Sequence, residues 1–378
     1  MNILEVVNVS LAGGVLHVAI EQARNLNILG HKTALLSNLF IPRANEFFGK
    51  DTHIIYTFKI PLPMFFSNYL YGFLRELTGR LAIFNKNFVK KFMPDWVICQ
   101  DLRAAPIAHK ICSETDAKLA IIMHSLNYPP SPIRYIMTDL MGLSSKFYIE
   151  CARKLLLKSD LLLAMMHDNV RLVKQIFGLE ALPLPFGCHP LKKIPSVRRN
   201  YILYFGRLSL GKGVHKIARA IALADRNAKV VFAGSTHSTT RTLIRMIKKT
   251  GLKNYTILTN ISKNVKNKLF LHAKMVVYWR SETDFLVPAC YGVPIVTHRK
   301  RYAGEVFIDS VHGRILESES EEELIEEFAN AIRELLTDER RARTMGYNAW
   351  LLVRRKYTWR HHVEKLLDYI GAIDRRKL

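Results

Sequence analysis

The loop GRLSLGKG, residues 206–213, has the residue types of a phosphate-binding site. Glycines at both of its ends allow tight backbone turns, and the N–H groups that open a following helix attract anions. Arg207 and Lys212 add two cations. An arginine can hold two phosphate oxygens at once, whereas a lysine acts as a mobile point charge. The loop therefore indicates binding of a phosphate or diphosphate. The alternative is a capped turn with two solvated basic residues.

The charge of the chain also indicates an anionic partner. The 378 residues include 56 Lys/Arg and 32 Asp/Glu, which gives a formal net charge of +24. Residues 201–300 hold 18 of the basic residues and 3 acids, whereas residues 301–350 hold 6 arginines and 12 acids. A concentrated basic region is typical of proteins that meet nucleic acid, anionic lipid or a nucleoside diphosphate. A basic surface without a dedicated partner has the same composition.

Other features predict a cytosolic protein without a metal site. No apolar run reaches the roughly 18–20 residues of a membrane span, and the N-terminus NILEVV has no signal-peptide pattern. The five cysteines are scattered and form no CxxC pair, which indicates reduced thiols. No Asp-x-Asp carboxylate pair lies in a suitable loop, so we expect no metal and no other cofactor.

Two series of short apolar runs alternate with amphipathic stretches, which predicts βα units and parallel sheets covered by helices. The strand-like runs of the first series are Ile3–Val7, Thr33–Ser37, Trp96–Cys99, Leu119–Met123 and Leu161–Met165, with helices at Val18–Leu29 and Asn169–Phe177. Those of the second series are Tyr201–Phe205, Lys229–Ala233, Tyr255–Leu258, Met275–Trp279 and Pro294–Thr297. Helices are expected there at Val214–Ala224, Thr239–Thr250, Asn264–Ala273, Glu321–Leu336 and over 338–371.

A proline-rich segment around residues 183–199 separates the two series and is typical of a linker. We therefore expect an α/β fold with two Rossmann-like, doubly wound domains. Their predicted bounds are residues 1–190 and 200–355, followed by a helix over 356–378. Ligands in such folds bind at the carboxyl ends of the strands.

In this setting the loop GRLSLGKG resembles the donor-phosphate loop of family-4 retaining glycosyltransferases, which have the GT-B fold and belong to the glycosyl transferases group 1. The resemblance covers nearly the whole chain, from the Gly-Gly loop and Gly-His turn near the N-terminus onward. The matching segments that follow in order are PDWVICQD (94–101), IIMHS (121–125), VVFAGS (230–235), GVPIV (292–296), GEVFIDSVHGRIL (304–316) and YTWRHHVEKL (357–366). The last is similar to the closing helix that crosses back toward the N-terminal domain in this family.

The resemblance implies a role for each matching residue. Gly206, Arg207 and Lys212 would hold the donor diphosphate. His124 would bond a sugar hydroxyl or lie near the reacting carbon, and Glu282, the first glutamate of the family's E-x7-E motif, would grip donor sugar hydroxyls. Simpler readings remain open: His124 is also explained as a strand-end histidine bonded to the backbone.

The resemblance also assigns the first loop, where Gly13 and Gly14 would let the backbone approach the donor sugar. A bare turn is the alternative. Two departures weaken the assignment of activity. Val287 stands where the second glutamate of the motif is expected, in a segment about three residues shorter than the pattern, and Gly187-Cys188-His189 stands where the family has Gly-x-Asp.

Residues 54–93 combine aromatic, leucine and basic side chains, with Lys86, Lys90 and Lys91 near their end. Such a stretch can lie on an anionic bilayer. The alternative is a long helix packed under the first sheet.

The function we expect is transfer of a sugar, with retention, from a nucleoside diphosphate sugar to a lipid-linked or glycan acceptor. The enzyme would be a hexosyltransferase of the cytoplasm, peripheral on the inner face of the membrane. A non-catalytic GT-B partner protein is the first alternative. A basic nucleic-acid-binding protein is the second, but no helix-turn-helix, RNP-type pair or zinc-finger spacing supports it, so no nucleic acid is expected.

Overall fold

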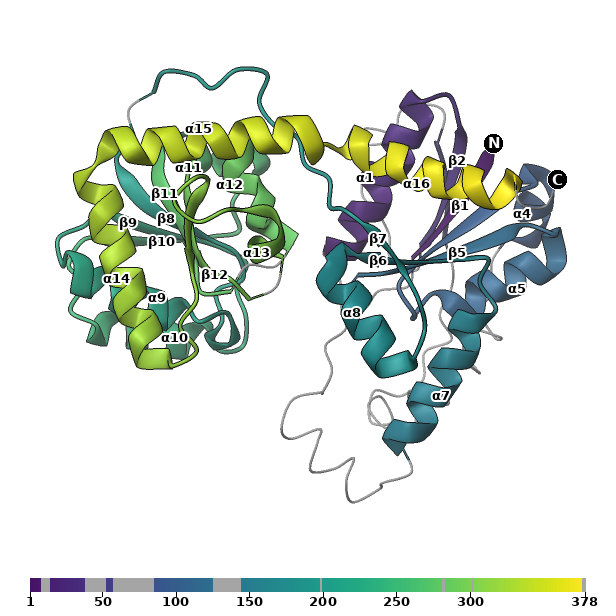
Figure 1. Cartoon of the computed structure of the whole chain (residues 1–378), viewed down its shortest axis with the longest axis horizontal. Coiled ribbons are helices and arrows are strands. Elements are labelled where there is room, and N and C mark those ends of the chain that lie inside the picture. Colours follow the sequence, from purple (N-terminus) through teal and green to yellow (C-terminus); the bar gives the residue numbers. More distant parts are fainter. Residues whose placement is uncertain are drawn as a thin grey trace. The chain divides into compact units, whose positions relative to one another are not determined.

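The computed structural model divides the chain into two compact units (Figure 1). The N-terminal unit comprises Met1–Gly187 and Trp359–Leu378, and the C-terminal unit comprises Cys188–Thr358. The described residues are 1–7, 14–37, 52–56, 85–124, 144–197, 199–280, 283–300 and 302–375. The last helix therefore belongs to the N-terminal unit, although the whole C-terminal unit precedes it in the sequence.

The N-terminal unit is built on a parallel sheet whose described strands run in the order β3-β2-β1-β4-β5-β6-β7. The central strands are buried almost throughout and consist mainly of apolar residues, as expected for a sheet covered on both faces. The strands are β1 Asn2–Val7, β2 Lys32–Ser37, β3 Thr52–Tyr56, β4 Trp96–Gln100, β5 Lys118–Met123, β6 Leu161–Met165 and β7 Leu182–Leu184.

Helices cover both faces of this sheet. The described helices are α1 Gly14–Ile28, α4 Lys86–Phe92, α5 Ala105–Thr115, α7 Ser144–Leu157, α8 Met166–Phe177 and α16 Trp359–Arg375. Apolar residues of α5, α7 and α8 share one hydrophobic core with alternate residues of β1, β4 and β5. Helix α1 packs in a separate cluster with Val7 and Leu35, and α16 lies against α1 (Figure 1).

The C-terminal unit has a second parallel sheet, with the order β10-β9-β8-β11-β12-β13 in the part that the structure describes. Its strands are β8 Tyr201–Phe205, β9 Val230–Gly234, β10 Tyr255–Thr259, β11 Ala273–Tyr278, β12 Ile295–His298 and β13 Gly313–Leu316. Its helices are α9 Val214–Ala224, α10 Thr240–Lys249, α11 Lys263–His272, α12 Val287–Cys290, α13 Ala303–Val306, α14 Glu321–Thr337 and α15 Glu339–Lys356. Both sheets are doubly wound, so the predicted α/β fold class is confirmed.

The predicted linker is partly wrong. Residues 182–184 form β7, which pairs in parallel with β6, so the sheet continues into the proline-rich segment. Pro183 is tolerated because β7 is the edge strand of the described sheet, where a residue without an N–H breaks no inner ladder. The prediction of one helix over 338–371 is also wrong, because two helices occur there. The helical conformation ends with α15 and begins again with α16.

The stretch 54–93 lies largely outside the described residues. Residues 54–56 belong to β3 and residues 86–92 form α4, so the described ends are not parts of one long helix. Within the part of the chain that the structure describes, no helix is long and apolar enough to cross a bilayer.

Candidate functional site

The predicted phosphate loop follows the carboxyl end of β8 and leads into α9. Hydrogen bonds tie it to the end of β9, the start of α10 and the connection between them, and the shortest three are the following. The Gly206 N–H donates to the Ala233 carbonyl at 2.9 Å, and the Leu208 N–H donates to the Ser235 carbonyl at 2.8 Å. The Thr240 hydroxyl then donates to the Leu208 carbonyl at 2.8 Å. The loop is therefore held by its neighbour along the carboxyl edge of the sheet.

Glycine is required at the end of this loop. Gly213 has φ +67°, and a Cβ placed there would lie 2.4 Å from Cγ of Trp279. The indole of Trp279 is buried and stacked on Phe328, with ring centroids 5.2 Å apart. Because both rings are buried and a Cβ would overlap the indole, the sharp turn into α9 depends on a residue without a side chain. Trp279 was not predicted as a site residue, although its place just after β11 was a signal for it.

The two predicted cations occupy different positions in the loop. Arg207 is exposed, and its carbonyl accepts a hydrogen bond from the Tyr204 hydroxyl at 2.9 Å. Lys212 is half-buried and ends a short 3-10 helix, Leu210–Lys212. Gly213 is the N-cap of α9 and has no side chain to bond the first main-chain N–H groups of the helix. An anion can accept hydrogen bonds from these N–H groups. The arrangement can bind a phosphate, and the assignment of these residues to a donor diphosphate stays a prediction.

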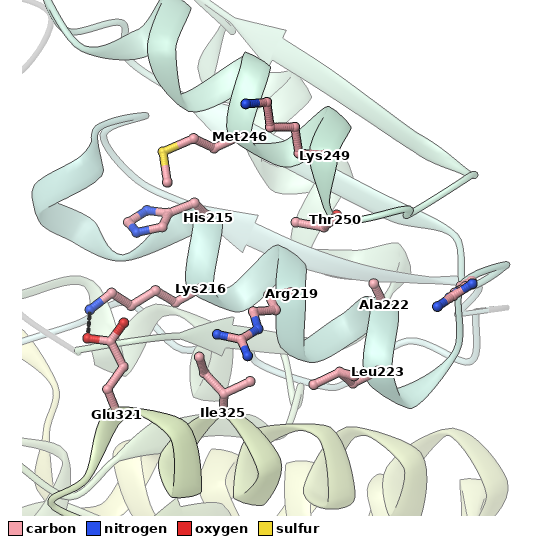
Figure 2. Close-up of a pocket in the computed structure, with 11 residues that line it drawn as sticks. His215, Lys216, Arg219, Ala222, Leu223, Met246, Lys249, Thr250, Glu321 and Ile325 are labelled. Carbon is pink, nitrogen blue, oxygen red and sulfur yellow. Dashed lines mark hydrogen bonds and ion pairs between the residues drawn. The ribbon is translucent and has the colours of Figure 1, made fainter.

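A separate basic groove lies between α9, α10 and α14 (Figure 2). Its volume is about 500 Å³. Two of its cations pair with the first turn of α14. Lys216 pairs with Glu321, and the two terminal guanidinium nitrogens of Arg219 donate to Glu322 at 2.6–2.9 Å. Arg207 and Lys212 do not line this groove, so it is not the predicted phosphate site.

His124 of the N-terminal unit follows β5 and is 3% exposed. Its main-chain carbonyl accepts a hydrogen bond from the Asn169 amide at 2.8 Å. The two strands beside β5 end in unusual backbone: Asp101 after β4 has φ +84° and Met166 after β6 has φ +65°. Such conformations are costly for residues with side chains and concentrate at functional sites. The predicted role of His124 at the donor sugar and the alternative of a strand-end histidine bonded to the backbone both stay predictions.

The imidazole of His124 is part of a buried polar network that was not predicted. Gln100 lies at its centre, with one amide end 2.6 Å from Nε2 of His124 and the other 2.7 Å from Glu5 and 3.2 Å from Gln22. Gln22 is in turn 3.1 Å from Nε2 of His362, which α16 contributes. The Nδ1 atom of His362 lies 2.6 Å from the Pro185 carbonyl oxygen.

Burial shifts the pKa of the three titratable members of the network. Loss of hydration raises the pKa of Glu5 to about 8, against a smaller opposite effect of the Gln100 hydrogen bond. Burial lowers the pKa of His124 to about 3 and that of His362 to about 4. All three groups are therefore uncharged near neutral pH, because burial disfavours the charged form.

The remaining predicted residues are described only in part. Gly13 and Glu282 lie outside the described residues, and Gly14 is the exposed first residue of α1. Val287 and the buried Pro288 form the first turn of α12, which is the place that a proline tolerates.

The end of α12 is held by Arg199, which donates to the carbonyls of Tyr291 and Gly292. Burial lowers the pKa of this arginine to about 10. The structure thus gathers Gly206, Arg207 and Lys212 in one loop, whereas His124 belongs to the other unit. Among the described residues, no group of three or more His, Cys, Asp or Glu side chains is arranged to hold a metal ion.

The chain was compared with protein families, curated sequences and solved structures. Residues 191–350 match the family described as glycosyl transferases group 1. No curated protein sequence matches the chain. The crystal structure of HepE from Anabaena in complex with UDP and glucose is 16% identical, with a TM-score of 0.74 over 98% of this chain and 100% of that one.

Two further solved structures are similar over their whole length. Sucrose-phosphate synthase from Thermosynechococcus elongatus has a TM-score of 0.73 at 13% identity and covers 100% of both chains. S. aureus TarM, in complex with α-GlcNAc-glycerol and UDP among others, has a TM-score of 0.71 at 12% identity over 97% of this chain and 99% of that chain. The fold is therefore the two-domain GT-B architecture, and the family match lies in its C-terminal unit.

Proposed function

We propose that this chain is a retaining, family-4 hexosyltransferase that uses a nucleoside diphosphate sugar and acts on a lipid-linked or glycan acceptor. The observation that carries the proposal is the loop 206–213. It combines two cations with an open helix N-terminus at the carboxyl edge of a parallel sheet, within the segment that matches the group 1 family. Ligands of doubly wound folds bind at that edge.

The chemistry of sugar transfer explains the residue types of this loop. When the anomeric C–O bond breaks, positive charge grows on the sugar and negative charge grows on the departing diphosphate. Arg207 and Lys212, already in place, stabilise the departing charge without the reorganisation that water would need. Binding of the distant nucleotide helps to hold the sugar in position. We propose no metal in this step, because two cations already serve the phosphates.

The other roles follow from the same reaction. His124 would contact the donor sugar near the reacting carbon, and Glu282 would hold its hydroxyls. Gly13 and Gly14 would allow the first loop to approach the sugar. HepE was solved with UDP and glucose, and TarM with UDP and α-GlcNAc-glycerol, which supports a nucleotide-sugar donor and a glycan-type acceptor here. We further propose a cytoplasmic location, peripheral on the inner face of the membrane.

A donor panel tests the proposal. The purified full-length protein is incubated with UDP-, GDP-, ADP- and dTDP-linked hexoses, and release of the nucleoside diphosphate is measured with and without candidate acceptors. We expect turnover or slow hydrolysis with one donor class. The anomeric configuration of the product linkage should be the same as that of the donor sugar. Inversion in the product would contradict the retaining assignment alone.

The non-catalytic alternative remains open on one observation. Val287, in α12, stands where a second glutamate is expected to contact the nucleotide. A folded protein that releases no nucleoside diphosphate from any donor, yet binds a nucleotide, would establish a partner protein in place of an enzyme.

A further inference from the structure

We infer that Glu5, Gln22, Gln100 and His362 form a buried hydrogen-bonded chain that fixes His124 as its Nδ1–H tautomer, with Glu5 as an un-ionised acid. These four side chains are positioning residues for His124. Their importance for sugar transfer rests on the proposed function, whereas the hydrogen-bond order rests on the contacts alone.

The order is set at the α16 end. A main-chain carbonyl can only accept, so the His362 nitrogen that lies 2.6 Å from the Pro185 oxygen, Nδ1, carries a proton. The ring is completely buried, and burial lowers its pKa to about 4, so it is neutral near pH 7. A neutral imidazole has one N–H, and therefore Nε2 of His362 is an acceptor. The Gln22 end group 3.1 Å away must donate to it.

The next two links follow without further choice. The structure places Nε2 of Gln100 toward Glu5 and Gln22, and Oε1 of Gln22 toward His362. The nitrogen and oxygen of an amide exchange places by rotation about the last bond, so we assign the two ends of each amide from their hydrogen-bond partners. If the Gln22 nitrogen faces His362, the Gln100 end group 3.2 Å from that nitrogen must be the oxygen. The same end of Gln100 lies 2.7 Å from Oε2 of Glu5, and with the Gln100 oxygen turned to that end the distance is usual for an O–H···O bond. Glu5 must therefore donate a proton to it.

The chain ends at His124. With its oxygen turned toward Glu5 and Gln22, Gln100 has its nitrogen at the other end, which lies 2.6 Å from Nε2 of His124. That nitrogen donates, so Nε2 of His124 accepts, and the proton of the neutral ring is on Nδ1. Every link thus joins one donor to one acceptor, from the Pro185 carbonyl to the imidazole that follows β5.

The opposite order needs a buried cation. It requires His362 to donate from both nitrogens, and a fully buried imidazolium is costly without direct pairing to an anion. Among the described residues, no donor reaches the Oε1 atom of Glu5, although an ionised carboxylate would need one.

The chain gives α16 a chemical task besides packing. The tautomer of a histidine decides which of its nitrogens can donate to a ligand. In the inferred order, Nε2 of His124 is engaged by Gln100, and Nδ1 holds the proton that can be donated to an oxygen. A residue 238 positions later in the sequence, His362, determines this outcome through Gln22 and Gln100.

Nitrogen NMR on the wild-type full-length protein tests the inference directly. The protein is labelled with ¹⁵N-histidine, the ring signals of His124 are assigned by their loss in His124→Gln, and the tautomer is read near pH 7. We expect the Nδ1–H pattern for both His124 and His362. An Nε2–H pattern at His124, or a doubly protonated His362, would overturn the inference whether or not the protein transfers sugar.

Infrared spectroscopy tests the Glu5 end. The difference between wild type and Glu5→Gln near pH 7 should contain the C=O band of a protonated carboxylic acid, and a carboxylate band in its place would overturn the inferred order. Gln100→Leu should release His124 to a mixture of tautomers and lower kcat more than it raises KM.

Thr33→Val is the matched control, because it removes another buried side-chain hydrogen bond of the same unit, outside the chain. It should leave the His124 signals and kcat unchanged. If it shifts both as much as Gln100→Leu does, the network is only structural.

Discussion

Arg207 and Lys212 carry the same charge, but the fold gives them different freedom. Arg207 is exposed at the carboxyl end of β8, whereas Lys212 is half-buried at the start of the turn into α9. Neither is needed to fill a core. Their side chains should therefore matter for ligand binding and rate more than for folding.

We expect Arg207→Ala and Lys212→Ala each to lower kcat/KM by on the order of 10²-fold, as loss of one charge contact in a transition state commonly does. Melting temperatures should stay close to wild type. Arg245→Ala is the control, because it removes an exposed cation of α10 from the same unit. Unchanged turnover in either loop variant, measured by nucleoside diphosphate release, would show that the donor phosphates bind elsewhere.

Glu5 makes the stability of the protein depend on pH. Its pKa is about 8 in the folded protein against 4.5 when exposed, so the folded state holds a proton that the unfolded state has lost between these values. Stability therefore falls as pH rises through this window. The other network members titrate lower, with a pKa of about 3 for His124 and about 4 for His362.

We expect Glu5→Gln to remove this dependence while keeping a donor for Gln100. Its advantage in unfolding free energy over wild type should grow by about 3 kcal/mol between about pH 5.5 and 8. Urea unfolding of both proteins across this range measures it. A constant difference would mean that Glu5 is ionised in the folded protein throughout.

The residues of the phosphate loop could be predicted because they are adjacent in sequence. Gly206, Arg207 and Lys212 lie within seven consecutive residues, so a local sequence motif is enough to identify them. The partners of His124 could not be found in this way. Glu5, Gln100 and His362 meet only through the pairing of β1 with β4 and the return of α16, and neither contact leaves a local pattern.

At the scale of elements, the turn into α9 has a clear steric requirement. Gly213→Ala would force φ +67° on a residue with a side chain and drive its Cβ to within 2.4 Å of the Trp279 ring. We expect a loss of roughly 1–3 kcal/mol in unfolding free energy, with weaker nucleotide binding because the loop is displaced.

Gly211→Ala is the matched control in the same loop. Its Cβ would meet nothing within 4 Å, and its φ is not positive. Both variants are compared by urea unfolding and by nucleotide titration. Equal losses in the two would show that glycine is not specifically required at residue 213.

The elements that sequence could predict are those with a clear apolar run or helical period. The predicted β6 and α9 have the bounds that the structure shows, because an apolar run or a helical period is unambiguous in both. The edge strands β3, β7 and β13 were missed. Pairing to a neighbour stabilises such strands, and residues such as Pro183 in β7 have no strand preference of their own.

For the whole molecule, the basic charge is spread over more than the phosphate loop. No acid occurs between Asp225 and Glu282, and α10 carries four basic residues and no acid. In the other unit, α4 presents Lys90 and Lys91 as exposed residues, whereas Lys86 bonds Glu114 at 2.7 Å. The basic residues of α10 and of α4 are therefore two candidate contacts for an anionic bilayer, one on each unit.

We expect the protein to bind anionic vesicles through the N-terminal unit, where the aromatic and basic stretch 54–93 ends in α4. Each basic residue near an anionic surface contributes about 1 kcal/mol, so replacing Lys90 and Lys91 by Glu should weaken binding by about 30-fold or more. Binding should fall with salt and be small on neutral vesicles. Co-sedimentation of the full-length protein measures both.

The double variant Arg245→Glu and Lys248→Glu on α10 changes the net charge equally in the other unit and should bind nearly as wild type. If it loses binding as strongly, attachment is governed by total charge or by α10. A protein that stays in the supernatant at low salt would instead favour a glycan acceptor in solution.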